Sequence, residues 1–109
     1  MPLEVQFFPM IELEKDRAQA GSRYLEFLRV PAMSAGLYVL AAGSTDPQQP
    51  HREDEMYYVV RGRAHFQAAA ENREVNAGEV IFVRAGVQHR FYDIAEDLTV
   101  LVFFAPAES

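Results

Sequence analysis

Hydrophobic and polar residues alternate in short stretches along most of this chain, and glycine, proline and acidic residues separate the stretches. Between residues 23 and 30, Tyr24, Leu28 and Val30 fall on one side of the alternation and Phe27 on the other. Successive side chains of a strand point to opposite faces, so this stretch predicts a strand that Pro31 ends. The same reasoning predicts strands over 35–42, 55–60, 64–69, 74–75, 80–83, 89–94 and 98–104.

The stretch 10–19 differs, because it mixes helix-forming residues with charges. It predicts a short helix that ends near Gly21, with a loop as the alternative. We expect no helix longer than about two turns, and we expect the polar residues 71–73 to form the tip of a hairpin. Short strands with turns about every eight to twelve residues are typical of an all-β, antiparallel sandwich or barrel.

The last predicted strand, 98–104, is apolar on both faces. One face is expected to fill the interior of the fold. The other must pack against a neighbouring layer, which would be either a flank of the same molecule or a second copy of the chain.

Composition narrows the function classes. A chain of 109 residues predicts one domain spanning 1–109. The net charge of -6 argues against nucleic-acid binding and against docking on anionic lipid, because both need a cationic face. The sequence has no cysteine, which rules out disulfides and thiolate ligands and fits a reducing cytoplasm.

Residues near the two ends of the sequence also indicate where in the cell the protein is expected. Glu4 stands where a secretory signal would carry basic residues, so we expect a cytoplasmic protein. The apolar run 98–105 is far shorter than the roughly 20 residues that a membrane-spanning helix needs.

Candidate chemistry is concentrated between Gly43 and Gly62. If this segment is extended, Gln49, His51, Glu53 and Glu55 share one face. An imidazole with nearby carboxylates on one face is the beginning of a divalent-metal site. A second stretch of similar build, 78–93, contains His89.

The two stretches together resemble the paired motifs of the cupin superfamily, in particular small single-domain bacterial cupins. The first motif, G-x5-H-x-H-x3-E-x6-G, matches the spacing from Gly43 to Gly62. The second, G-x5-P-x-G-x2-H-x3-N, matches the spacing from Gly78 to Asp93. The motif region therefore covers 43–93, and the resemblance implies an antiparallel jelly-roll β-barrel with a site inside its mouth and, often, a homodimer.

The resemblance also implies the ligands of a divalent cation, which would be iron, manganese, nickel or zinc. Residue by residue, His51, Glu55 and His89 carry over as metal ligands. The first metal histidine of the family falls on Gln49, whose neutral amide oxygen is a weaker ligand for a late transition metal. The motif proline falls on Arg84 and the motif asparagine on Asp93.

Several assignments around this site have alternatives. Glu53 shares its face with Glu55 and could replace it as a ligand if a local bulge turns the chain. Tyr57 and Phe91 share a face with Glu55 and His89 and are candidate pocket walls. Asp93 either orients a ligating histidine or begins a turn. The third histidine, His65, is expected to face outward.

These observations predict a protein that binds a divalent metal and acts on or binds a small organic molecule. If it is an enzyme, the reaction could be an oxygenation, an isomerisation or a decarboxylation, because the fold does not choose between them. The alternatives are a non-catalytic module that binds a small molecule, with or without a metal, and a barrel whose metal site has degenerated at Gln49.

Overall fold

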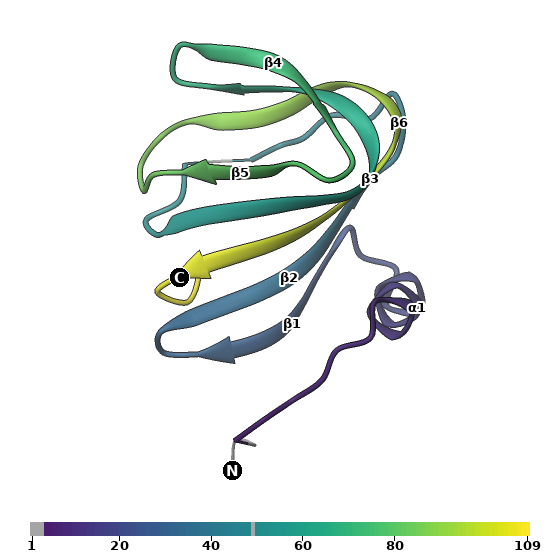
Figure 1. The fold of residues 1–109 in the computed structure, drawn as a ribbon, viewed down its shortest axis with the longest axis vertical. Coiled ribbons are helices and arrows are strands. Elements are labelled where there is room, and N and C mark those ends of the chain that lie inside the picture. Colours follow the sequence, from purple (N-terminus) through teal and green to yellow (C-terminus); the bar gives the residue numbers. More distant parts are fainter. Residues whose placement is uncertain (1–3, 49) are drawn as a thin grey trace.

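The computed structural model describes residues 4–48 and 50–109, and it confirms the all-β, antiparallel class. Six strands form one sheet in the order β1-β2-β6-β3-β4, with β5 also paired to β3. Their bounds are β1 Tyr24–Val30, β2 Met33–Leu40, β3 Asp54–Ala68, β4 Glu71–Asn76, β5 Val80–Val83 and β6 His89–Ala105. Figure 1 shows that the sheet curls over, so that β4 and the first half of β6 arch above β5 and the first half of β3.

Two long strands, β3 and β6, organise this curled sheet. They pair along almost their whole length, from Asp54 opposite Ala105 to Ala68 opposite His89. The pairing register shifts repeatedly between Val59 and His65, and such shifts bend a strand. The sequence predicted two separate strands in each of these regions, so those predictions were wrong about continuity.

Gly62 lies in the bent part of β3, where the sequence predicted a turn. Its φ is 102°, and a Cβ atom added there would lie 2.3 Å from the backbone oxygen of Asp97. Only glycine lets β3 approach β6 this closely in that conformation. The glycine therefore produces a bend within a continuous strand and not a break between two strands.

The helix α1, Met10–Ala20, has 11 residues and is longer than the two turns expected from the sequence. Gly21 ends it in the left-handed region, with a φ of 70°, and donates its N–H to the carbonyls of Arg17 and Ala18. Leu13 is buried, and Glu14 forms an ion pair with Arg61. The helix thus occupies the stretch that the sequence predicted and ends at the predicted glycine, and it exceeds only the expected length of about two turns. Among the described residues, no helix has the length and hydropathy that a membrane crossing requires.

The hairpin between β3 and β4 turns two residues earlier than predicted. Ala69 and Ala70 form the turn, and Ala69 has a φ of 52°. Residues 71–73, which we expected at the tip, belong to β4. Alanine carries no turn signature, so the local sequence could not reveal this position.

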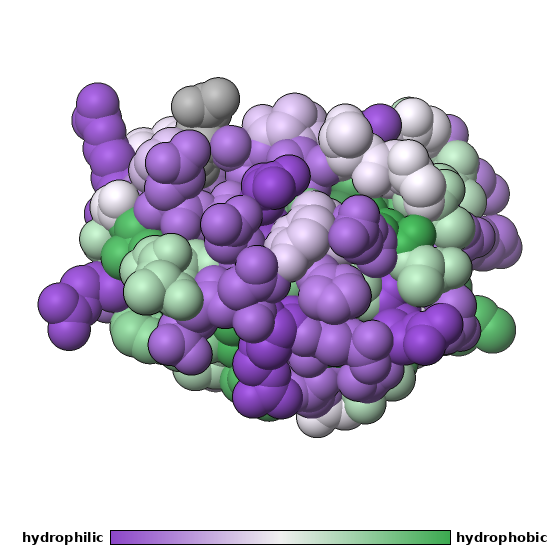
Figure 2. All heavy atoms as spheres, turned by 90° about the horizontal axis from the view of Figure 1, so that it is seen from above, coloured by the Kyte–Doolittle hydropathy of each residue, from purple (hydrophilic) through white to green (hydrophobic). Residues whose placement is uncertain are grey.

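The interior of the curled sheet is the hydrophobic core. Alternate residues of β3 and β6, including Tyr57, Val59, Val100 and Val102, are fully or almost fully buried inside it. In contrast, β4 is exposed at every residue except Val75. Accordingly, hydrophilic side chains cover most of the face seen from above in Figure 2. The predicted strand alternation therefore separates an apolar inside from a polar outside.

Candidate metal centre

Three residues that are distant in the sequence meet inside the cup. His51 lies three residues before the first residue of β3, Glu55 is the second residue of β3, and His89 is the first residue of β6. Each offers one potential ligand atom, and these atoms all lie within 4.8 Å of one another. Glu55 and His89 are buried, and His51 is partly exposed. The structure thus brings together the two histidines and the glutamate that the motif spacing singled out.

Backbone contacts of the two motif segments hold the cluster in position. The N–H of Gly86 donates to the carbonyl of His51 at 2.7 Å, and the N–H of Ala85 donates to Oδ1 of Asp54 at 2.9 Å. Asp54 and His51 flank the start of β3, while Ala85 and Gly86 lie just before β6. The loop that contains Ala85 and Gly86, which belongs to the second motif, therefore holds the backbone of His51 in the first motif.

The side-chain distances describe a cluster centred on Glu55. Its Oε1 atom lies 2.8 Å from Nε2 of His89 and 3.8 Å from Nε2 of His51. Within the described chain, this buried oxygen nevertheless has no well-directed hydrogen-bond partner. A buried carboxylate oxygen without a partner is energetically costly unless a cation compensates it.

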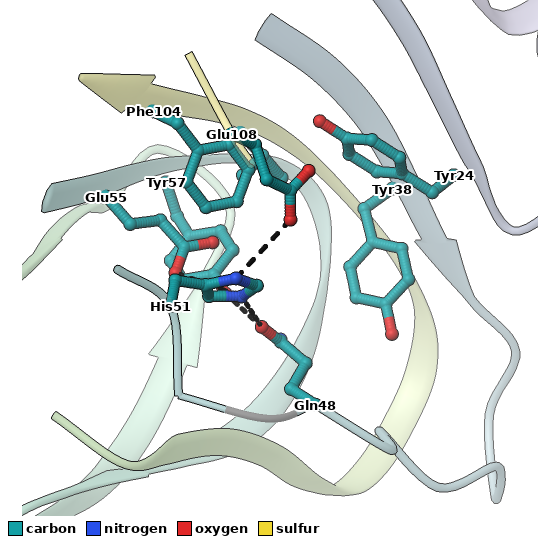
Figure 3. Close-up of a pocket in the computed structure, with 9 residues that line it drawn as sticks. Tyr24, Tyr38, Gln48, His51, Glu55, Tyr57, Phe104 and Glu108 are labelled. Carbon is teal, nitrogen blue, oxygen red and sulfur yellow. Dashed lines mark hydrogen bonds and ion pairs between the residues drawn. The ribbon is translucent and has the colours of Figure 1, made fainter. Parts of the chain in front are cut away.

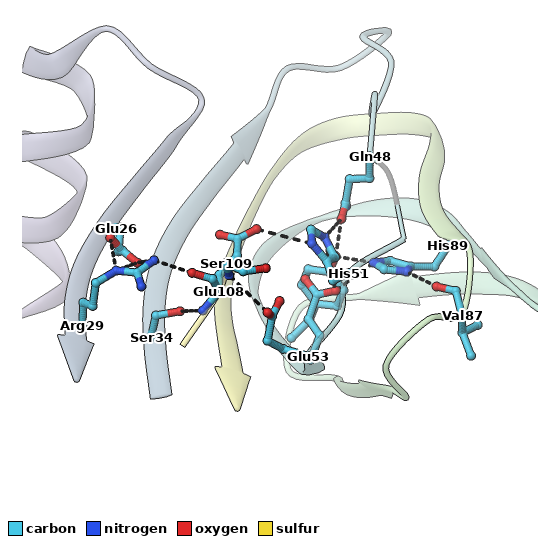
Figure 4. A network of polar contacts seen from close by, with 12 residues as sticks. Glu26, Arg29, Ser34, Gln48, His51, Glu53, Val87, His89, Glu108 and Ser109 are labelled. Atoms are coloured by element: carbon cyan, nitrogen blue, oxygen red, sulfur yellow. Dashed lines mark hydrogen bonds and ion pairs between the residues drawn. The ribbon is translucent and has the colours of Figure 1, made fainter. Parts of the chain in front are cut away.

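The outer nitrogens of both histidines face acceptors. Nδ1 of His89 lies 2.8 Å from the carbonyl of Val87, so it must be the protonated nitrogen of that ring. Nδ1 of His51 lies 3.3 Å from Oε2 of Glu108. In the neutral rings, these two contacts, which are drawn in Figure 4, favour a proton on Nδ1. The lone pair of each Nε2 atom is then on the side of Glu55.

The environment of His89 favours a positive charge on its imidazole ring. Burial of the ring is the largest influence and lowers the pKa of His89, but the Glu55 carboxylate and the Val87 carbonyl together raise it above its ordinary value. The same groups that favour a proton on Nε2 also favour a metal cation there. The lone pairs of two imidazoles and one carboxylate converge, so the residues present fit a divalent metal.

A cavity of about 120 Å³ opens beside the cluster (Figure 3). Its polar wall contains the hydroxyl-bearing side chains of Tyr24, Tyr38 and Tyr57, and its apolar wall contains Val102 and Phe104. Burial is the main cause that raises the pKa of each of the three tyrosines, so their hydroxyls stay neutral. The cavity can therefore offer neutral hydrogen-bonding groups to a small ligand.

The hydroxyl of Tyr24 is buried and makes no hydrogen bond within the part of the chain that the structure describes. Its ring crosses directly over Gly36, where a Cβ atom would lie only 2.1 Å from the tyrosine ring. The absence of a side chain at Gly36 thus allows Tyr24 to reach the cavity.

Other predicted site residues lie at varying distances from the cluster. Tyr57 lines the cavity, and its hydroxyl lies 3.1 Å from Nε2 of His89. Phe91 lies in the core, where its ring packs against Tyr57 and Phe66. Glu53 is buried, but its Oε2 atom accepts the N–H of Ser109 and it does not join the three clustered residues.

Two further predictions concern Asp93 and Gln49. Asp93 is exposed, with a φ of 46°, and the carbonyl of Val87 orients His89 instead. Gln49, which we expected as a fourth ligand, lies outside the described residues. His65 packs against the ring of Tyr92 and lies outside the cluster.

Sequence reasoning missed three polar residues near the cluster: Asp46, Gln48 and Glu108. Asp46 and Gln48 lie in the loop before His51, at positions that the first motif leaves unspecified. Glu108 lies in the segment after β6, which carried no motif. Arg29 donates to the carbonyl of Glu108, and the N–H of Glu108 donates to Oγ of Ser34 (Figure 4).

Comparison with known sequences identifies the relatives of this chain. The sequence profile of the family described as "Cupin domain" matches residues 36–104. The uncharacterized protein SCO3923 of Streptomyces coelicolor is 52% identical over 102 residues, which cover 94% of this chain and 97% of that protein.

Solved structures share the fold. KdgF from Halomonas sp. aligns with a TM-score of 0.69 at 20% identity, covering 76% of this chain and 78% of that one. A Cupin 2 conserved barrel domain protein from Salinispora arenicola aligns with a TM-score of 0.68 at 19% identity, covering 96% and 90%. At such identities the likeness establishes the fold, and the predicted jelly-roll is confirmed. Because the family profile also spans more than half of the sequence, this chain belongs to the cupin family.

Proposed function

We propose that this cupin binds a divalent metal ion through His51, Glu55 and His89 and presents it to a small organic molecule. The observation that carries the proposal is the buried Oε1 atom of Glu55, which faces Nε2 of both histidines and has no hydrogen-bond partner among the described residues. Iron, manganese, nickel and zinc are all compatible with two imidazoles and one carboxylate. A bound ion would supply Lewis-acid or oxygen-activating chemistry.

The residues around the cluster support a small ligand. The cavity of about 120 Å³ is well below the roughly 300–1,000 Å³ of pockets for drug-sized molecules. Tyr24 offers an unpartnered hydroxyl, while Val102 and Phe104 exclude water from one side. We infer that the ligand is a compact molecule with at least one hydrogen-bonding oxygen.

Elemental analysis of freshly purified protein tests the metal. We expect close to one divalent ion per chain and a lower melting temperature after chelation, because a ligand at about 100 times its dissociation constant stabilises a native state by about 2.7 kcal/mol. His51→Ala should lose the ion, whereas His65→Ala, which alters a histidine outside the cluster, should retain it. Equal metal retention by the two variants would refute the proposed site.

Catalysis requires a separate test. Oxygen consumption by the iron-loaded protein can be followed over a panel of small acids and diols, with the His51→Ala variant as the background. Turnover that depends on His51 supports an oxygenase. A metal-loaded protein that binds members of the panel without converting them is a non-catalytic binding module.

We also propose that residues 1–109 form a single cupin domain. We propose in addition that this domain forms a homodimer through the outer face of β3 and β5. Four exposed apolar residues lie on this face as two cross-strand pairs, Met56 opposite Phe82 and Tyr58 opposite Val80. An apolar patch on paired strands is the kind of surface that a second copy can cover.

Sedimentation tests the dimer. We expect Phe82→Glu to shift the protein to monomer, because it places a charge within the patch. Phe7→Glu is a matched control, since Phe7 is even more exposed but lies outside β3 and β5. A wild-type protein that is monomeric at high concentration would exclude the dimer.

A further inference from the structure

The side chain of Gln48 reaches the cluster from the loop that precedes β3. Its Oε1 atom lies 3.2 Å from Nε2 of His51 and 2.9 Å from the hydroxyl of Tyr57 (Figure 3). The amide oxygen therefore lies on the side of His51 that faces Glu55, and not on the outer side, where Glu108 contacts Nδ1.

Asp46 fixes the direction in which this amide points. Oδ2 of Asp46 lies 2.7 Å from Nε2 of Gln48 and also accepts the backbone N–H of Phe91 at 2.9 Å. The hydroxyl of Tyr38 donates to Oδ1 at 2.6 Å. An ionised carboxylate only accepts hydrogen bonds, so the NH₂ group of Gln48 must face Asp46 and its oxygen must face the cluster.

This orientation brings together two atoms that both carry lone pairs. The Glu108 carboxylate favours a proton on Nδ1 of His51, which leaves Nε2 of His51 as an acceptor. The amide oxygen of Gln48 is also an acceptor, yet the two atoms are only 3.2 Å apart. A cation held by the cluster would remove this conflict, as it would for the buried oxygen of Glu55.

We propose that the amide oxygen of Gln48 is a further ligand of the metal, with Asp46 as the residue that positions it. This inference rests on the proposed metal site. It transfers to Gln48 the role that motif spacing assigned to Gln49. The spacing argument assumed an extended segment. The described residues between Gly43 and His51 form no strand, and the segment contains Pro47 and Pro50, which cannot donate a backbone hydrogen bond to a neighbouring strand.

Titration with Mn²⁺ and with Ni²⁺, in competition with a chelator, tests the ligand. We expect Gln48→Ala to weaken binding of both ions by about tenfold or more, and we expect Gln49→Ala to leave binding unchanged. Gln48→Glu keeps an oxygen near His51 but loses the NH₂ group that donates to Asp46, so it should restore only part of the affinity. The partly exposed position of Gln48 should leave each variant folded, which a melting curve of the metal-free protein checks.

A spectroscopic readout separates a ligand from a residue that merely contacts His51. We expect the visible absorption of bound Co²⁺ to change in Gln48→Ala, because the ligand field changes when a ligand is lost. An unchanged spectrum would overturn the assignment of Gln48 as a ligand. A loss of affinity in Gln49→Ala but not in Gln48→Ala would likewise overturn it.

The His51→Ala variant distinguishes the two proposals. If His51→Ala loses the metal while Gln48→Ala binds it as tightly as the wild type, the metal site stands and the role of Gln48 is rejected. If the wild type binds none of the three ions, both proposals are rejected.

Discussion

Nε2 of His89 lies 2.8 Å from Oε1 of Glu55, although His89 begins β6 and Glu55 lies near the start of β3. The Glu55 end of β3 pairs with the far end of β6, so this contact crosses the interior of the cup. Neither atom is free to turn away, because Val87 holds the opposite nitrogen of His89 and Glu55 is almost completely buried. The fold thus holds a carboxylate beside an imidazole in the interior, where the pair favours a positive charge on or near the ring.

We expect His89→Ala to abolish metal retention, because it removes a nitrogen that faces Glu55. His65→Ala is the matched control, since the ring of His65 contacts Tyr92 on the outside of the fold. Metal content and the change in melting temperature on chelation measure the effect. A His89→Ala protein that is folded and still retains the ion would show that another residue provides the essential nitrogen.

Glu108 is expected to increase the affinity for the metal through its contact with His51. Glu108→Ala removes the acceptor that lies 3.3 Å from Nδ1 of His51, and loss of such a partner typically weakens metal binding by about 10–100-fold. Glu108→Gln keeps an oxygen acceptor and should restore part of the affinity. The control is Glu96→Ala, because Glu96 is exposed and pairs with Arg63. Equal affinities for Glu108→Ala and Glu96→Ala would exclude this role.

Stability should fall in alkaline solution because of Tyr24 and Tyr38. Burial, helped by neighbouring acidic groups, raises the pKa of both hydroxyls above the ordinary value of about 10. Below that value the folded and unfolded chains hold the same phenolic protons. Above it the unfolded chain loses protons that the folded chain retains, so the free energy of unfolding decreases as the pH rises.

Urea unfolding from about pH 8 to about pH 11 measures this dependence. Tyr24→Phe should make it shallower, and it does so without the loss of a hydrogen bond, because the Tyr24 hydroxyl has no partner among the residues that the structure describes. An identical pH dependence in Tyr24→Phe and the wild type would contradict the prediction.

Two glycines allow a comparison of packing with backbone strain. Gly62 and Gly78 have similar positive φ values, 102° and 94°, but only Gly62 has a backbone atom in the space of a Cβ. Gly78→Ala should cost about 1–3 kcal/mol for the strained conformation alone. Gly62→Ala should cost clearly more, because β3 and β6 must also separate. Denaturant unfolding measures both variants, and equal losses would mean that the contact with Asp97 is easily relieved.

The sequence by itself determined the fold class and identified two histidines and a glutamate that the fold brings together. Strand alternation separated the core residues from the exposed ones, and motif spacing singled out His51, Glu55 and His89. These features are predictable because a period of two and a fixed spacing are local properties that the chain order preserves. The positions of single turns, such as the one at Ala69, were less accessible because they depend on the paired strand.

Only the tertiary structure decided which other polar groups meet at the cluster. Gln48 enters through an irregular loop whose direction no periodic pattern describes, and its orientation depends on Asp46. Glu108 reaches His51 because backbone contacts with Arg29 and Ser34 fold the segment after β6 back over the cavity. Such contacts join residues far apart in the chain, and their geometry arises only when the sheet curls and brings distant segments within hydrogen-bonding distance.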